Sequence, residues 1–398
     1  MTFNTHFENL QKYPFERLRA LTADIQPPNS LRHIPLSLGE PKHAPPAFVL
    51  DALTDRDMLA TSLSSYPASK GSDALREAIG AWVKRRFGVA VNADTQVLPV
   101  SGTREALFAV AQALLSGQSD RRVIMPNPFY QIYEGATLLA GAAPYFVNND
   151  ATAGYQQDFA TIPAEVWRTT ELLYLCSPGN PTGHIMPLAQ QQQLIELAHR
   201  YDFHIVADEC YAELYFDEPP PSLLNAAVEM GHADFSRCLI FHSLSKRSNL
   251  PGLRSGFVAG DARLMERFAQ YRTYHGCALP PHHQIASALA WSDDQHVDEN
   301  RALYRQKFSA VAAILDPYYR LQQPQGGFYH WLPVPMDEQT FCQELLRHQH
   351  VTVMPGSFLA RATPDGNPGS GHVRVAWVAT YADCVEAAER MAEFARRL

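Results

Sequence analysis

Short apolar runs rich in β-prone residues alternate with helical patterns through the middle of this chain. The runs cover residues 97–100, 122–125, 172–176, 203–207, 238–242 and 256–260. Continuous β-prone runs separated by helices are typical of a largely parallel sheet with both faces covered. We therefore expect an α/β fold built around such a sheet.

The chain of 398 residues is long enough for two or three domains at ~150 residues each. After about residue 280 the pattern changes to long amphipathic stretches with short strands between them. This change predicts a smaller α+β domain. We place boundaries near Val49 and Pro281, which gives a large cofactor-binding domain over 50–281. Residues 282–398 and an N-terminal arm over 1–49 would form the small domain.

Charge and composition exclude several classes of partner. The formal net charge is −8 and no block of lysine and arginine stands out, which argues against nucleic acid. No apolar run approaches the roughly 20 residues that span a bilayer, and the first residues do not resemble a signal peptide. The six cysteines are far apart, and the histidines lack metal-ligand spacing. We expect a cytoplasmic protein without a membrane, nucleic-acid or metal partner.

Polar residues follow four of the apolar runs directly. Ser101, Ser177, Asp208 and Ser243 each come immediately after such a run. In open α/β sheets, ligands bind outside the carboxyl ends of the strands. These residues therefore predict a binding site at one edge of the sheet.

Lys246 follows one of these ends, in Ser243-Leu244-Ser245-Lys246. A partly desolvated lysine amine can hold an aldehyde cofactor covalently. Ser243, Ser245 and Arg254 can bind a phosphate beside it, with the arginine as a bidentate fork. Ser101-Gly102-Thr103 opens a helix and would add backbone N–H groups at the positive end of the helix dipole. The two hydroxyls there can also serve as ordinary helix caps.

An aldehyde cofactor with a pyridine ring works as an electron sink only if its ring nitrogen stays protonated. Asp208, at a strand end, is suited to hold that proton in place. The adjacent Glu209 should point to the opposite side and is interpreted as structural. Together with Lys246 and the phosphate ligands, this carboxylate predicts a pyridoxal phosphate site.

Further side chains can contact the cofactor ring. Tyr211 and Asn180 can donate hydrogen bonds to a ring hydroxyl and so tune the basicity of the lysine-linked nitrogen. Residues 127–130 supply an aromatic side chain to pack against the ring, and Tyr130 is preferred over Phe129. Lys246, Asp208 and Tyr211 are the predicted catalytic residues.

These motifs together resemble the fold type I pyridoxal phosphate aminotransferases. The resemblance is carried by Ser-x-Ser-Lys with Arg254, Asp208-x-x-Tyr211, Asn180-Pro181-x-Gly183 and Ser101-Gly102-Thr103. It implies that Gly39 lies over the substrate, with Asn180 beside it, and that Arg374 holds the substrate α-carboxylate. It also implies a homodimer with shared active sites, in which Tyr66 reaches the phosphate of the neighbouring subunit.

Residues 13–18, 246–254 and 367–371 are similar to N-succinyldiaminopimelate aminotransferases of lysine biosynthesis. This resemblance implies amino transfer from N-succinyl-LL-2,6-diaminopimelate to 2-oxoglutarate, with Lys246 as general base and acid. Such a substrate carries a second carboxylate, which requires a further cation. The sequence leaves five candidates open: Arg17, Arg19, Lys70, Arg247 and Arg272.

Other functions on the same scaffold stay open. Aspartate, alanine, aromatic or LL-diaminopimelate transaminases would share these motifs. A C–S lyase would use the same lysine, aspartate and arginine. A transcription regulator would carry a helix-turn-helix domain ahead of the fold, where we find only about 40 residues, and the net negative charge of the chain opposes DNA binding.

Overall fold

The computed structural model describes residues 4–398; residues 1–3, the start of the predicted N-terminal arm, lie outside the described part. Its main feature is an eight-stranded sheet with the order β2-β9-β8-β7-β6-β3-β4-β5. The strands are β2 (Val97–Val100), β3 (Arg122–Asn127), β4 (Ala143–Asp150), β5 (Gln156–Gln157), β6 (Thr170–Cys176), β7 (His204–Asp208), β8 (Cys238–Ser243) and β9 (Gly256–Gly260).

The sheet is mostly parallel, as expected. The β4, β3, β6, β7 and β8 strands pair in parallel. β9 runs antiparallel between β8 and β2, so β2 points in the same direction as β8. The carboxyl ends of β2, β6, β7 and β8 therefore meet at one edge of the sheet. The polar residues that follow these strands, Ser101, Ser177, Asp208 and Ser243, were predicted to lie there.

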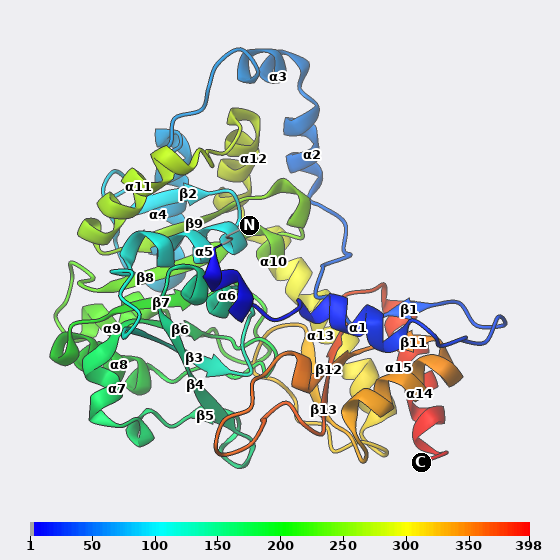
Figure 1. The fold of residues 1–398 in the computed structure, drawn as a ribbon. Coiled ribbons are helices and arrows are strands. Elements are labelled where there is room, and N and C mark those ends of the chain that lie inside the picture. Colours follow the sequence, from blue (N-terminus) through cyan, green and yellow to red (C-terminus); the bar gives the residue numbers. More distant parts are fainter. Residues whose placement is uncertain (1–3) are drawn as a thin grey trace.

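Helices cover both faces of this sheet (Figure 1). Successive strand residues point to opposite faces. Ile205 of β7 packs in the cluster that includes Trp82 and Leu194, while Val206 packs in the one that includes Leu107 and Phe268. The helices of this part are α4 (Asp73–Phe87), α5 (Thr103–Leu114), α6 (Ile132–Leu139), α7 (Ala164–Thr169), α8 (Leu188–Tyr201), α9 (Leu223–Glu229), α10 (Leu244–Arg247), α11 (Ala262–His275) and α12 (Pro281–Ser292).

A third apolar cluster lies beside the large sheet and is built mainly from the C-terminal part of the chain (Figure 1). Its antiparallel sheet has the order β10-β13-β12, and β1 pairs in parallel with β11. The strands are β1 (Ile34–Pro35), β10 (Tyr329–Pro333), β11 (Val351–Thr352), β12 (Met354–Pro355) and β13 (His372–Ala376). The helices are α1 (Pro14–Thr22), α13 (Gln295–Leu315), α14 (Glu338–Gln349) and α15 (Tyr381–Ala395).

The remaining elements are short connections. They are α2 (Ala47–Thr54), α3 (Arg56–Ser62) and the 3-10 turns η1 (Thr5–Asn9), η2 (Ala151–Ala153), η3 (Phe159–Thr161), η4 (Pro251–Leu253) and η5 (Gly356–Phe358). α12 packs on α4 and α2, and its Ala286, Ala290 and Trp291 share the apolar cluster of the large sheet with Val49. That core thus extends past Pro281, and the division at Val49 and Pro281 stays a prediction. No helix in residues 4–398 combines the length and the apolar character that crossing a membrane requires.

Candidate active site

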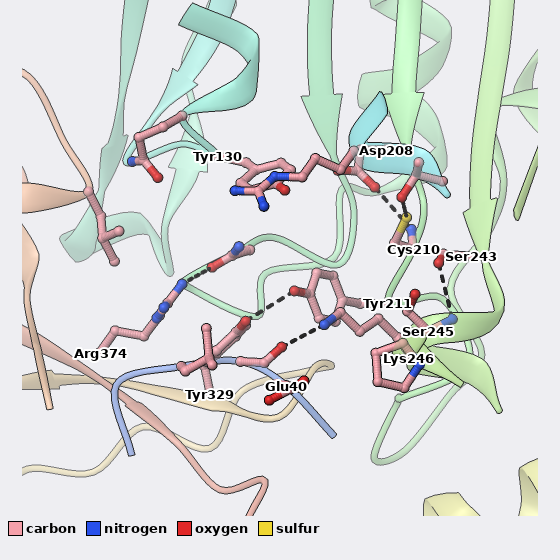
Figure 2. Close-up of a pocket in the computed structure, with 18 of the residues that line it drawn as sticks. Glu40, Tyr130, Asp208, Cys210, Tyr211, Ser243, Ser245, Lys246, Tyr329 and Arg374 are labelled. Carbon is pink, nitrogen blue, oxygen red and sulfur yellow. Dashed lines mark hydrogen bonds between the residues drawn. The ribbon is translucent and has the colours of Figure 1, made fainter. Parts of the chain in front are cut away.

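The polar strand ends open into a cavity of about 680 Å³ between the large sheet and the C-terminal small sheet, whose Tyr329 and Arg374 also line it. Most of the predicted site residues line it: Gly39, Thr103, Tyr130, Asn180, Asp208, Tyr211, Ser243, Ser245, Lys246, Arg254 and Arg374. Figure 2 shows Lys246 and Arg374 on opposite sides of the cavity, with Tyr130 and Tyr329 along its other two sides. Three predicted residues, Ser101, Gly102 and Tyr66, do not line it.

Lys246 enters the cavity from the short helix α10, which begins directly after β8. The Ser243 hydroxyl caps this helix by accepting a 3.1 Å hydrogen bond from the backbone N–H of Ser245. Lys246 Nζ donates a 2.6 Å hydrogen bond to the Gly39 carbonyl. Burial lowers the pKa of the amine from 10.5 to about 8. An amine with this pKa is partly neutral, and thus nucleophilic, near physiological pH.

Asp208 ends β7 and is 4% exposed. It accepts a 2.7 Å hydrogen bond from the Tyr133 hydroxyl and a 3.2 Å bond from the backbone N–H of Cys210. Burial raises the pKa of this carboxyl, and the hydrogen bonds from Tyr133 and Cys210 offset the increase only in part. A buried carboxylate favours a nearby positive charge. A protonated pyridine nitrogen would supply one, so Asp208 fits the predicted role.

The adjacent Glu209 points away from the cavity, as expected for the next residue of a strand. Its carboxylate accepts bonds of 3.0 Å from the Ser222 hydroxyl and 2.8 Å from the Leu223 backbone N–H. His242 Nε2 lies 2.9 Å from its second oxygen. Glu209 thus connects β7 to the start of α9, which is a structural role.

A site for an anion lies where α5 begins. Gly102 precedes this helix at φ 85, and no side chain caps the helix, so the first N–H groups are open to a ligand. The positive φ favours glycine here, and a Cβ at Gly102 would lie 2.2 Å from Arg254 Nη2, so a side chain would displace this guanidinium from the start of α5. Thr103, Ser243 and Arg254 line the cavity beside it. This set of donors suits a phosphate group.

Two predicted cofactor ligands lie elsewhere in the single chain. The Ser101 hydroxyl donates a 2.8 Å hydrogen bond to the Cys277 carbonyl, outside the cavity. Tyr66 is fully exposed. The resemblance placed Tyr66 in the site of a neighbouring subunit, and the roles of both residues stay predictions.

The opposite wall can bind a carboxylate. Arg374 on β13 is 5% exposed; its Nη1 donates to Asn180 Oδ1 at 3.0 Å and its Nη2 to the Ser37 carbonyl at 2.8 Å. Its Nε is buried without a hydrogen-bond partner among the described residues. Tyr329 completes this wall, and a Cβ at Gly39 would lie 1.8 Å from its hydroxyl. Gly39 therefore has to be a glycine for the segment to pass here.

Several lining residues were not predicted from the sequence. Tyr329, on β10, lines the cavity and no local motif marks it. Tyr13 also lines it; it belongs to residues 13–18, which carried a resemblance but no predicted role in the site. Tyr133, on α6, does not line the cavity but contacts Asp208. Arg104 follows Ser101-Gly102-Thr103 directly, so its place in the first turn of α5 was an available signal. Cys210 lies within the predicted Asp208-x-x-Tyr211 motif.

The aromatic side chain beside the cavity is Tyr130, since Phe129 is buried in the core. None of the five basic residues left open for a second carboxylate lines the cavity. Arg247 is buried and pairs with Asp294 at 2.7 Å, and Arg272 is buried and pairs with Glu105 at 2.5 Å. A further cation, Arg104, does line the cavity, and its Nη2 lies 2.5 Å from the Tyr13 hydroxyl.

A family model, "Aminotransferase class I and II", matches residues 32–391. The chain belongs to this family. The class I and II aminotransferases depend on pyridoxal phosphate, and the cavity fits this cofactor. Lys246 can hold its aldehyde, Asp208 its ring nitrogen, and the start of α5 with Arg254 its phosphate.

This aminotransferase is similar to several known proteins. A solved aminotransferase structure from Neisseria meningitidis is 45% identical, with a TM-score of 0.94 over 98% of this chain and 100% of that one. An LL-diaminopimelate aminotransferase of Desulforudis audaxviator is 30% identical over 390 residues, 96% of this chain and 95% of the relative. The 4-dedimethylamino-4-oxo-anhydrotetracycline transaminase OxyQ of Streptomyces rimosus is 34% identical over 357 residues, 89% of this chain and 92% of the relative.

Proposed function

We propose that this aminotransferase moves the α-amino group of N-succinyl-LL-2,6-diaminopimelate to 2-oxoglutarate. The observation that carries the proposal is a further arginine, Arg104, which lines the same cavity as Arg374 and the predicted phosphate ligand Arg254. A substrate with two well-separated carboxylates would use both guanidinium groups.

Arg104 is available for this task. Its Nη2 contacts the Tyr13 hydroxyl at 2.5 Å, and its guanidinium carbon lies 5.2 Å from the centre of that ring. Among residues 4–398, no acidic side chain forms an ion pair with Arg104. A planar guanidinium with free donors suits bidentate binding of a carboxylate. Arg374 would hold the α-carboxylate and Arg104 the distal succinyl carboxylate.

The chain's own residues then account for the transfer. Pyridoxal phosphate, when bound, supplies an aldehyde and an electron-withdrawing ring. Lys246 Nζ removes the α-proton of the amino acid and later returns a proton as general acid. Asp208 keeps a negative charge next to the ring nitrogen. Arg374 and Asn180 orient the α-carboxylate, and Tyr211 completes the wall beside Lys246.

Members of this family typically form dimers, and we propose the same for this chain. Tyr66 is fully exposed, and Leu63, Ile285 and Leu289 are exposed apolar residues that a second copy would cover. Tyr66 would then reach the phosphate site of the partner. We also keep the cytoplasm as the proposed location, since all six cysteines are free.

A second candidate substrate is LL-diaminopimelate without the succinyl group. The similar LL-diaminopimelate aminotransferase of Desulforudis audaxviator favours it. Its distal end carries a carboxylate, which Arg104 could also bind, and an ammonium group, which would need an acidic partner. Glu40 lines the cavity but already lies 2.6 Å from Lys42 Nζ, and Asp208 faces the predicted ring position. The acidic residues that line the cavity thus leave no partner for that ammonium, which favours the succinylated substrate.

An amino-donor panel with 2-oxoglutarate tests the proposal. It would contain N-succinyl-LL-diaminopimelate, LL-diaminopimelate, aspartate, alanine and an aromatic amino acid, and glutamate formation would be measured. We expect the succinylated donor to have the highest kcat/KM, at least about tenfold above LL-diaminopimelate, which is the value of one good charged contact. A higher value for any other donor would contradict the substrate. Pyruvate release from cystathionine without an oxo acid would instead identify a C–S lyase.

A further inference from the structure

Three side chains with metal-binding atoms converge behind the start of α5. Glu105 lies in the first turn of α5, His275 is the last residue of α11, and Cys277 follows two residues later. One ligand atom of each lies within 4.8 Å of the others. No metal site was expected from the sequence, because the cysteines lie far apart and the histidines lack metal-ligand spacing.

The spacing of these atoms is close to that of a metal centre. His275 Nδ1 lies 3.1 Å from Cys277 Sγ and 3.6 Å from Glu105 Oε1. A tetrahedral zinc ion with bonds of about 2.0–2.3 Å separates its ligand atoms by roughly 3.3–3.5 Å. Small side-chain rotations would therefore be sufficient for all three atoms to reach one ion.

Other contacts hold the ligands in place. Arg272 donates from Nη1 to Glu105 Oε1 at 2.5 Å and from Nη2 to the Cys277 carbonyl at 3.0 Å. The same carbonyl accepts the Ser101 hydroxyl at 2.8 Å. Glu105 Oε2 is buried without a hydrogen-bond partner of normal geometry among the described residues. Oε1, the oxygen next to His275, thus accepts the supporting arginine and keeps a second lone pair for an ion, and Oε2 has no other bond to give up.

We propose that Glu105, His275 and Cys277 bind one divalent transition-metal ion of the zinc class, with water as the fourth ligand. The Glu105 carboxylate is negatively charged, and the Cys277 thiol gives up its proton when an ion binds, so the bound ion would face two negative charges against the single positive charge of Arg272. Imidazole and thiolate ligands select zinc-like ions over magnesium and calcium. The His275 side chain is 39% exposed, which gives the ion access from solvent.

The site would connect two segments next to the cofactor's predicted phosphate site. Glu105 lies just after Gly102 and Thr103, and Cys277 contacts Ser101. A bound ion would thus fix the loop after α11 to the N-terminal turn of α5. Ligands that bind only the folded state raise its stability. Zinc should therefore raise the Tm of the holoenzyme, whatever amino acid the enzyme uses.

Equilibrium dialysis of the holoenzyme against zinc chloride, with metal analysis by mass spectrometry, tests the site. We expect one zinc per chain, with at least about tenfold weaker binding in both His275→Asn and Cys277→Ser. Mutation of a residue that only supports a metal ligand already weakens metal binding about 10- to 100-fold, and loss of a ligand itself should weaken it at least as much. His232→Asn is the matched control. His232 stacks on His199 at 4.3 Å and forms a surface histidine pair that can attract zinc on its own.

Three results would overturn the proposal: no zinc retained by the wild type, equal retention in His275→Asn, or loss of zinc in His232→Asn alone. His275 is partly exposed, so its variant should fold even if Cys277→Ser does not. Cofactor absorbance would confirm that each variant is intact. Cadmium in place of zinc adds a direct readout, a thiolate-to-cadmium ultraviolet band that Cys277→Ser should lack.

Discussion

The hydroxyl of Tyr133 donates a 2.7 Å hydrogen bond to Oδ2 of Asp208, and both side chains are buried. This bond joins α6 to the end of β7. It orients the carboxylate that faces the cofactor's predicted ring position. The bond also favours the charged form of Asp208 in a place where burial opposes it.

Replacing Tyr133 by phenylalanine should therefore weaken the site without disrupting the core. Loss of a hydrogen bond to a charged group costs about 1.5–3 kcal/mol, so we expect kcat/KM to fall by about tenfold or more. Steady-state kinetics would measure the fall in kcat/KM, and titration with the cofactor would measure any loss of cofactor affinity. Tyr174→Phe is the control, since Tyr174 stacks on Tyr133 and bonds only the Leu107 carbonyl. An equal loss of activity in that variant would argue for a packing effect.

Asp208 and Glu209 are adjacent carboxylates, and we expect substitution of the first to reduce catalysis and of the second to reduce stability. Asp208→Asn removes the charge beside the ring nitrogen, and we expect kcat to fall by about 10²–10³, the usual effect of one electrostatic group. Glu209→Gln weakens the link to α9 and should lower the unfolding free energy by about 1–3 kcal/mol. Kinetics and thermal unfolding of both variants would separate the roles. Similar catalytic losses would contradict this division.

The lowered pKa of Lys246 predicts how cofactor attachment depends on pH. The amine is protonated below its pKa of about 8 and neutral above it. The attachment rate should rise with pH, by about tenfold per unit between pH 6 and 7, and level off above about pH 8. Stopped-flow absorbance after mixing apoprotein with pyridoxal phosphate would record this. A profile still rising steeply at pH 9 would contradict it, and Lys246→Ala should neither attach the cofactor nor transaminate.

Arg374 and Arg104 should differ in which donors they affect. Arg374→Gln removes the group for the α-carboxylate, so KM should rise for every amino donor. Arg104→Gln should raise KM only for donors with a distal carboxylate, by about 30-fold, since a charged hydrogen-bonded contact contributes ~2 kcal/mol. Alanine is the matched substrate without a distal group. An equal effect of Arg104→Gln on alanine would exclude the proposed distal role.

Much of the fold could be predicted because its signals are local. The apolar runs of β2, β3, β6, β7, β8 and β9 were found within two residues of their observed bounds. β4 was missed, since its run includes Pro144 and ends in asparagines. α12 lies past the predicted domain boundary, because its apolar face packs on α4 and α2 rather than on its neighbours in sequence.

The chemistry at the strand ends could be predicted from sequence, because Lys246, Asp208, Asn180 and Arg254 follow β-prone runs in motifs of fixed spacing. The distant side chains that complete the site became visible only in the folded chain. Tyr133 reaches Asp208, Tyr13 reaches Arg104, and Glu105 meets Cys277 across long separations in the chain. The physical reason is that strand and helix patterns depend on neighbouring residues, whereas these contacts depend on how helices pack against the sheet and against one another.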